Sequence, residues 1–222
     1  MSTPLRAVLF DAEGTLLHIH PSVGEVYARV LSREGLFLPG EELDRRIRAL
    51  WPVFRRAFFG KFSPEGCRQL WKEIFSQALA PWLDGHPVER LFQAVYEAFS
   101  RPESFRLASG TREALEGLKR QGLKVAILSN WDERLPRLLK ALGLKDHFEA
   151  VFLACELGVG KPAPEAFHLA CEALGVAPPE VLMIGNDPED DYQGALSAGL
   201  RARLYRGEDL REILREEGLW CA

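Results

Sequence analysis

The chain has 222 residues, of which 47% are hydrophobic and 27% charged, a balance typical of a folded globular protein. Lys and Arg number 28 against 32 Asp and Glu, and a net charge of −4 argues against a nucleic-acid-binding domain, which is usually strongly basic. No apolar run reaches the roughly 18 residues of a membrane span, and residues 1–6 leave no room for a signal peptide. We therefore expect a cytoplasmic protein that binds neither nucleic acid nor a membrane.

The four cysteines are widely scattered and include no CxxC pair. Metal–thiolate sites need closer clustering, and disulfides are typical of secreted chains. We therefore expect no disulfide and no cysteine-bound metal, but small buried side chains and one thiol near the C-terminus: Cys67, Cys155, Cys171 and Cys221. This cysteine usage agrees with a cytoplasmic location.

The first predicted element is a buried strand at 7–10, and the next convincing strand comes only after residue 120. The intervening segment instead shows helical periodicity, at 22–34, 41–58, 64–79 and 87–100. It holds nine of the 13 Phe and three of the five Trp. Such large side chains are expected to fill the core of a small helical bundle.

From residue 110 onward, strands alternate with helices. Predicted strands lie at 125–128, 150–153, 181–184 and, more weakly, 202–205; predicted helices lie at 111–121, 132–142, 163–175, 191–199 and 208–217. Glycines at 122, 143, 175 and 199 fall where helices would end. Short, continuously apolar strands between helices predict a parallel sheet covered on both faces. We expect a Rossmann-like, doubly wound α/β core of residues 1–16 and 106–222, with an all-helical domain of residues 17–105 inserted into it.

Polar side chains follow the first two strands of this sheet. Asp11 comes directly after the first strand and is placed to act as a nucleophile or metal ligand, with Glu13 beside it as an acid or base. An ordinary acidic turn is the alternative. Ser129 and Asn130 end the next strand, where they suit an oxyanion contact; the alternative is that Asn130 or Asp132 simply caps the following helix.

Two further segments complete the set. Lys161, between Gly160 and Pro162, could place an ammonium beside a phosphate or a carboxylate, or could be a solvated surface lysine. The turn from Asn186 to Asp191 carries four carboxylates, which repel one another unless a cation compensates them; oxygen ligands of this kind suit Mg²⁺, and a solvated acidic loop is the alternative. Because parallel strands end at one edge of a sheet, a shared site explains all four segments better than four coincidences.

These four segments, in this order, resemble those of haloacid dehalogenase superfamily hydrolases, in the subgroup with a helical cap between the first two motifs. Residues 21–28 and 129–135 also resemble the Reg-2-like branch. The resemblance covers essentially the whole chain. It implies that residues 17–105 form a cap domain and that the protein is a Mg²⁺-dependent phosphatase of a small phosphorylated metabolite.

The resemblance also implies a role for each position. Asp11 matches the nucleophile that forms an aspartyl-phosphate, with Glu13 as the acid/base group. Ser129 and Asn130 match the contacts to the phosphoryl oxygens, and Lys161 matches the lysine that offsets negative charge. The metal ligands implied are Asp11, the backbone carbonyl of Glu13, Asn186 and Asp187, with Asp191 as a supporting acidic residue.

Two positions depart from the family pattern. Glu13 stands where most phosphatases of the group have Asp, and one extra methylene shifts the carboxyl relative to the proton it must move. Asn186 stands where Asp is usual; its amide oxygen can bind Mg²⁺ but adds no negative charge, and Asp187 is the obvious substitute.

Two alternatives keep the fold but change the function. A 2-haloacid dehalogenase would use the same aspartyl-ester chemistry to attack carbon without a metal; the acidic turn and Glu13 argue against it. A non-catalytic, ligand-binding member of the family is the other alternative, and Glu13 is the feature that motivates it.

Overall fold

The computed structural model describes residues 3–58 and 62–220, without the side chains of 55–58. Its central sheet has the strand order β5-β4-β1-β6-β7, and every pairing is parallel. The strands are β1 (Ala7–Phe10), β4 (Lys124–Ser129), β5 (Ala150–Leu153), β6 (Val181–Gly185) and β7 (Arg201–Leu204). All five correspond to predicted strands. The order reverses at β1, so the crevice above its carboxyl end is the expected ligand site.

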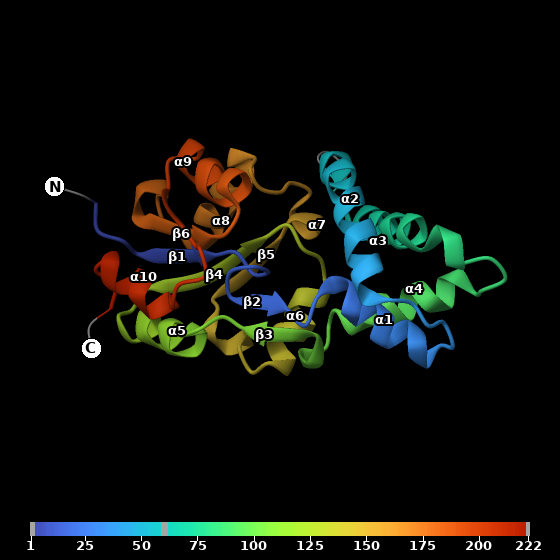
Figure 1. The fold of residues 1–222 in the computed structure, drawn as a ribbon. Helices are drawn as coiled ribbons and strands as arrows, with labels where there is room; N and C mark the ends of the chain where they lie inside the picture. Colours follow the sequence, from blue (N-terminus) through green and yellow to red (C-terminus); the bar gives the residue numbers. More distant parts are fainter. Residues whose placement is uncertain (1–2, 59–61, 221–222) are drawn as a thin grey trace.

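Helices cover both faces of this sheet (Figure 1). Alternate side chains of β1 point to opposite faces: Val8 and Phe10 pack in one cluster, and Ala7 and Leu9 in another. The first cluster includes residues of α5 (Thr111–Arg120), α6 (Arg134–Ala141) and α10 (Leu210–Glu216), and the second includes residues of α8 (Pro164–Leu174) and α9 (Gly194–Ser197). The doubly wound α/β core is therefore confirmed.

Four helices form the inserted domain, beside the core in Figure 1. They are α1 (Val23–Arg33), α2 (Gly40–Phe58), α3 (Pro64–Leu79) and α4 (Val88–Ala98), each within two residues of its predicted bounds. Their interior is aromatic, as expected: the Phe75 ring lies 6.0 Å from Tyr27 and 5.7 Å from Phe92, centroid to centroid. The helical cap is thus confirmed, while its limits at residues 17 and 105 stay a prediction.

The connection between cap and core was not predicted from the sequence. Strands β2 (Leu17–Ile19) and β3 (Phe105–Leu107) pair antiparallel and join the two parts as a short ribbon. Each has three residues, too few for a strand periodicity to stand out. Other short elements were missed for the same reason: α7 (Ala154–Leu157) and the 3₁₀ turns at 80–82, 102–104, 145–147 and 178–180. The helix predicted at 191–199 is preceded and partly replaced by a π-helical turn (Pro188–Gln193).

The predicted helix ends are confirmed by backbone geometry. Gly122, Gly143, Gly175 and Gly199 have φ values of 74°, 67°, 63° and 82°, the left-handed region that terminates a helix and that glycine adopts without a Cβ clash.

The prediction of no disulfide was wrong. Cys67 of α3 and Cys155 of α7 form one, with their Cα atoms 6.1 Å apart and a separation of 88 positions in sequence. Both lie in a small apolar cluster with Phe54, Leu70 and Ile74, so packing between cap and core brings together two cysteines that the sequence keeps apart. Cys171 is a buried free thiol, as predicted, and Cys221 lies outside the described residues. The cysteines therefore no longer support the prediction of a cytoplasmic location.

Removing this disulfide is expected to lower the free energy of unfolding by about 2–4 kcal/mol, because the cross-link restricts the unfolded chain. Urea unfolding of the wild type should shift to lower midpoints when a reductant is added. The double variant Cys67→Ser/Cys155→Ser should unfold at the lower midpoint with or without reductant, while Cys171→Ala should keep the wild-type dependence. A wild-type unfolding midpoint that is the same with and without reductant would contradict the disulfide between Cys67 and Cys155.

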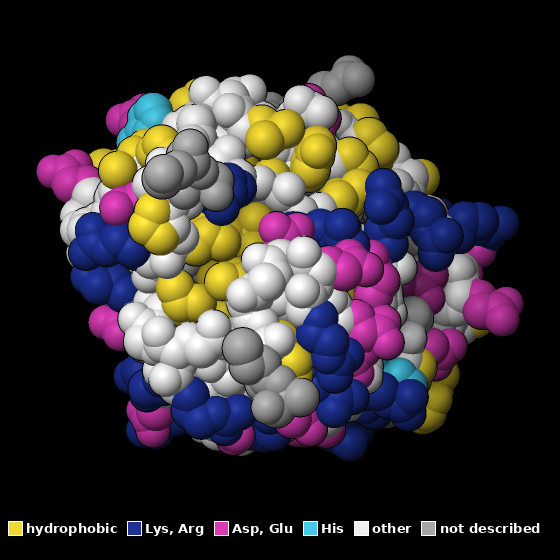
Figure 2. All heavy atoms as spheres, turned by 90° about the vertical axis from the view of Figure 1, so that its left-hand side faces the viewer, with side chains coloured by type: hydrophobic (Ala, Val, Ile, Leu, Met, Phe, Trp, Pro, Cys, Tyr) yellow, Lys and Arg dark blue, Asp and Glu magenta, His cyan; other side chains and the backbone are white. Residues whose placement is uncertain are grey.

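The outer face of the core carries charges of both signs. Figure 2 shows the side of the molecule that lies away from the cap, with Lys and Arg interspersed among Asp and Glu around apolar side chains. This mixture agrees with the small net charge of −4. Among the described residues, no helix combines the length and apolar character required to cross a membrane.

Candidate functional site

The four polar segments meet in one place, as the parallel sheet predicts. A cavity of about 500 Å³ opens above the carboxyl ends of β1, β4 and β6, with the core as its floor and the cap helices as its walls. All residues singled out from the sequence line it: Asp11, Glu13, Ser129, Asn130, Lys161, Asn186, Asp187 and Asp191. We refer to this space as the cavity.

Lys161 is the centre of the site. Its side chain is only 2% exposed, and Nζ donates hydrogen bonds to Oδ1 of Asp11 and to Oδ1 of Asp191, both at 2.6 Å. Burial alone would lower the pKa of Lys161, but the two carboxylates raise it above its ordinary value. Lys161 is therefore a buried ammonium between two carboxylates, and the alternative of a solvated surface lysine is excluded.

Asp11 is nearly as enclosed as its lysine partner. Its side chain is 11% exposed at the end of β1. Burial raises the pKa of Asp11 to about 7, against the lowering effect of Lys161; the negative charge of Asp191 adds to the rise. A carboxylate held in such surroundings keeps its charge only through nearby positive charge, which Lys161 supplies.

Asn130 fixes the backbone of Lys161. Its side-chain amide donates to the Lys161 carbonyl and accepts from the Lys161 N–H, both at 2.8 Å. A Cβ at Gly160 would lie 2.6 Å from the Asn130 oxygen, so the close approach needs glycine there. The Asn130 side chain thus positions Lys161, a role the sequence did not indicate. Ser129 is buried at the end of β4 and lines the cavity directly.

Glu13 lies on the loop after β1, next to the acidic turn. The residue as a whole is exposed and lines the cavity. Protein atoms around its carboxyl nevertheless desolvate that group and raise the pKa of Glu13, while a hydrogen bond from the Ile19 backbone N–H opposes the rise. Gly14 follows at φ 88°, and a Cβ there would come 2.5 Å from the Asn186 side chain. Asn186 therefore packs against the backbone that carries Glu13.

Thr15 was not singled out from the sequence, although it stands in the same loop four residues after Asp11. It is fully buried, and its hydroxyl donates to the Asn186 amide oxygen at 3.2 Å. This bond ties the loop after β1 to the turn after β6.

The acidic turn distributes its charges among different partners. Oδ1 of Asp187 accepts the backbone N–H groups of Glu189 and Asp190, both at 2.8 Å, and so caps the π-helical turn. Asp191 points to Lys161 and also accepts the Asp187 N–H at 2.9 Å. Asp190, which sequence reasoning did not separate from its neighbours, lines the cavity 3.5 Å from the Asn130 amide. Lys161 and the backbone thus offset the repulsion between these carboxylates.

The oxygen atoms around the cavity suit a magnesium ion. Within the described residues, no three His, Cys, Asp or Glu side chains form a ready-made metal cluster. Mg²⁺, however, usually takes only one or two carboxylates and keeps water and substrate oxygens as its other ligands. Asp11, Asp187 and Asp190 supply carboxylates at one cavity, and Asn186 supplies an amide oxygen. This oxygen-only set is compatible with Mg²⁺ and unsuited to a softer metal.

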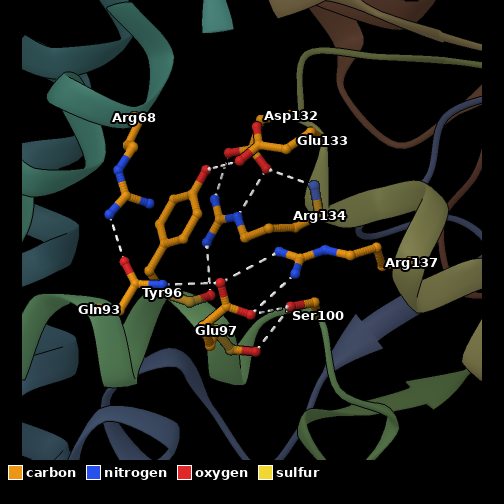
Figure 3. A network of polar contacts seen from close by, with 9 residues as sticks. All are labelled: Arg68, Gln93, Tyr96, Glu97, Ser100, Asp132, Glu133, Arg134 and Arg137. Carbon is orange, nitrogen blue, oxygen red and sulfur yellow. Dashed lines mark hydrogen bonds and ion pairs between the residues drawn. The ribbon is translucent and has the colours of Figure 1, made fainter. Parts of the chain in front are cut away.

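A buried ion pair joins the core side of the cavity to the cap (Figure 3). Asp132 lies in the loop after β4, and Arg134 is the first residue of α6. The Arg134 Nε and Nη2 atoms donate to the two Asp132 carboxylate oxygens at 2.8 and 2.6 Å, and the side chains of Arg134 and Asp132 are 4% and 0% exposed. The Arg134 guanidinium lies 3.8 Å from the ring centre of Tyr96 in α4, whose hydroxyl donates to Glu133 at 2.8 Å. The sequence indicated Asp132 only as a possible cap of this helix, and its carboxylate does accept the Arg134 N–H at 3.1 Å; the Asp-x-Arg spacing is the signal that indicates the ion pair as well.

The family profile "Hydrolase: haloacid dehalogenase-like hydrolase" matches residues 5–199. The phosphoserine phosphatase of Thermus thermophilus is 34% identical, covering 97% of this chain and 100% of that protein. Haloacid dehalogenase-like hydrolase domain-containing protein 3 of Xenopus laevis is 31% identical, covering 90% and 84%. The rhythmically expressed gene 2 protein of Drosophila melanogaster is 25% identical, covering 96% and 87%, which agrees with the predicted Reg-2-like resemblance.

Solved structures show the same architecture. The L-2-haloacid dehalogenase of Xanthobacter autotrophicus superposes with a TM-score of 0.71 at 28% identity, covering 96% of this chain and 83% of that one. A HAD phosphatase of Thermococcus onnurineus gives 0.66 at 26% identity, covering 96% and 98%. The Bacillus subtilis HAD-hydrolase YfnB, solved bound to magnesium, shares the fold with a TM-score of 0.81 at 20% identity, covering 97% and 100%. Together, the profile, the relatives and the shared fold show that this chain belongs to the haloacid dehalogenase-like hydrolases.

Proposed function

We propose that this hydrolase is a Mg²⁺-dependent phosphatase that acts on a small phosphate monoester through an aspartyl-phosphate on Asp11. The observation that carries the proposal is the buried Lys161 ammonium bonded to both Asp11 and Asp191 at the floor of the cavity. A carboxylate that attacks an anionic phosphate needs adjacent positive charge to overcome repulsion. Relatives named as phosphoserine phosphatase and phosphoglycolate phosphatase, 34% and 31% identical, support the same chemistry.

In the first step, a carboxylate oxygen of Asp11 attacks phosphorus and the bond from phosphorus to the leaving alcohol breaks. Glu13, which lines the cavity and has a raised pKa, donates a proton to the departing oxygen. Ser129 and the backbone at Asn130 hold the phosphoryl oxygens, and Lys161 offsets their charge.

In the second step, a water attacks the phosphorus of the aspartyl-phosphate while Glu13 accepts its proton. The bond between phosphorus and the Asp11 oxygen breaks, which releases inorganic phosphate and restores the carboxylate. The same group thus serves as acid and then as base.

Asp11, the backbone carbonyl of Glu13, Asn186 and Asp187 would hold the Mg²⁺, with Asp191 as the supporting acidic residue. When bound, the ion supplies charge neutralisation at the phosphate. Asn186 contributes no charge, so the carboxylates of Asp187 and Asp190 at the same cavity are the groups that compensate for it.

A panel of phosphate monoesters, assayed with Mg²⁺ and with a chelator, tests the proposal. Turnover of some esters with Mg²⁺ and its loss on chelation are expected. If the protein hydrolyses none of them but is stabilised against heat by phosphate, it is the non-catalytic, ligand-binding alternative.

Glu13→Gln is expected to lower kcat/KM for an alkyl phosphate about 100-fold, because this parameter reports the first step, in which the leaving alkoxide then departs unprotonated. The loss should be much smaller for p-nitrophenyl phosphate, whose leaving group needs no proton. Glu13→Asp keeps the carboxyl and should stay closer to the wild type for both esters. Equal losses of Glu13→Gln on the two esters would contradict the acid role.

Two observations favour the 2-haloacid dehalogenase alternative. The neutral Asn186 reduces the charge available to a metal, and the Xanthobacter autotrophicus dehalogenase is 28% identical. In that reaction Asp11 would attack carbon, halide would leave, and water would hydrolyse the ester. Release of chloride from 2-chloropropionate without Mg²⁺ would favour it over the phosphatase.

A further inference from the structure

The walls of the cavity differ sharply from its floor. The floor holds the charged residues around Lys161, whereas the cap supplies large apolar side chains from all four of its helices. They include five aromatic side chains and one isoleucine: Tyr27, Trp51, Trp71, Phe92, Tyr96 and Ile74. Trp51 of α2 and Trp71 of α3 stack with ring centres 5.7 Å apart and an interplanar angle of 19°, which places two indole rings together in the cap wall.

Two polar groups in the same region, the Asp44 carboxylate and the Tyr96 hydroxyl, are already bonded to other parts of the protein. The Asp44 carboxylate accepts the Ser22 hydroxyl and, at 2.7 Å, the Gly24 N–H. The Tyr96 hydroxyl donates to Glu133. These groups would have to break existing bonds to receive the polar groups of a ligand.

Arg134 presents a flat cation whose charge is already paired. Its Nε and Nη2 atoms bond Asp132, and its plane lies over the rings of Tyr96 and, at 5.2 Å, Trp71. Arg48 of α2 also lines the cavity, but it is exposed. The interior of the cap wall therefore offers a ligand apolar surface and aromatic faces.

We propose that the substrate is a phosphate monoester whose leaving group is a flat, apolar body, of the aryl or arylalkyl class, seated against Trp51 and Trp71. The proposal rests on the proposed function for the position of the phosphate, which lies at Asp11 and Lys161. It excludes phosphorylated sugars and amino acids as preferred substrates.

The physical basis is the difference in desolvation between the two ligand classes. Burying an aryl group against aromatic side chains removes apolar surface from water and adds ring–ring contacts. A polar group that contacts these ring faces loses water without gaining a hydrogen-bond partner from them, which disfavours its binding. We expect at least a tenfold preference for the apolar ligand.

Binding of two phosphonates tests this without any turnover. 2-Phenylethylphosphonate and 2-amino-3-phosphonopropionate both carry a non-hydrolysable phosphonate, but the second replaces the ring with charged groups. Calorimetric titration of the wild type with Mg²⁺ should give a Kd at least tenfold lower for the phenylethyl compound. Equal affinities, or tighter binding of the amino acid analogue, would overturn the proposal.

Two variants locate the binding surface. Trp51→Ala removes a side chain that is already 40% exposed and should reduce the preference several-fold. Phe37→Ala removes a phenyl ring that is 79% exposed and does not line the cavity, so it should leave the preference unchanged. If the two variants behave alike, the aryl group does not bind where we place it.

Turnover of acetyl phosphate, measured in parallel, separates this proposal from the proposed function. Its leaving group, acetate, carries no ring that could pack against the aromatic wall. Preferential phenylethylphosphonate binding without acetyl phosphate hydrolysis would overturn the phosphatase but support the apolar ligand class. Acetyl phosphate hydrolysis without that preference would support the phosphatase and overturn the apolar ligand class.

Discussion

Asp11→Asn is expected to lower phosphatase turnover at least ~1000-fold, because the amide cannot form the aspartyl-phosphate. The substitution is nearly isosteric. It leaves Lys161 bonded to Asp191, so the buried ammonium keeps one charged partner and the fold should persist. Steady-state kinetics with Mg²⁺, together with a thermal unfolding curve, would separate lost chemistry from lost structure.

Asp84→Asn provides the matched control for this experiment. Asp84 undergoes the same chemical change at an exposed position away from the cavity. It should keep wild-type turnover. An Asp11→Asn protein that folds normally and retains more than a tenth of the wild-type rate would rule out Asp11 as the nucleophile.

Asp132→Asn is expected to lower the free energy of unfolding by about 3–5 kcal/mol. The pair it breaks is almost wholly buried, so the Arg134 charge would be left without its partner in surroundings that water cannot reach. Asn retains the ability to accept the Arg134 backbone N–H, which Asp132 now accepts at 3.1 Å, and the helix start should survive. Urea unfolding followed by circular dichroism measures the loss.

The chain contains a second copy of this arrangement at the surface. Asp209 and Arg211 repeat the Asp-x-Arg spacing, with bonds of 2.8 and 2.7 Å and the same backbone contact, but with side chains 16% and 39% exposed. Asp209→Asn should therefore change stability far less than Asp132→Asn, because water replaces the lost charge. Equal effects at the two sites would show that burial does not set the strength of the Asp132 pair.

The sequence predicted those elements that carry a clear period or an unbroken apolar run. The strand at 7–10 and the helix at 64–79 were placed with the bounds that the structure shows. The three-residue strands β2 and β3 were missed, because their pairing depends on bringing residue 18 beside residue 106 across the whole cap.

That the candidate residues line one cavity was predictable, because four motifs in one order imply one sheet edge. Their individual bonds were not. Three of these contacts join segments far apart in the chain. They are the hydrogen bonds of the Asn130 side chain to the Lys161 backbone, the hydrogen bond from Thr15 to Asn186, and the disulfide between Cys67 and Cys155. Local spacing carries no information about such distances.

The central claim is that Asp11 becomes phosphorylated, and a crystal structure with Mg²⁺ and beryllium fluoride tests it most directly. Beryllium fluoride mimics a phosphoryl group attached to a carboxylate. The account predicts beryllium bonded to an oxygen of Asp11, with its fluorides near Ser129 and Lys161. Beryllium fluoride bound elsewhere, with an unmodified Asp11 carboxylate, would contradict it.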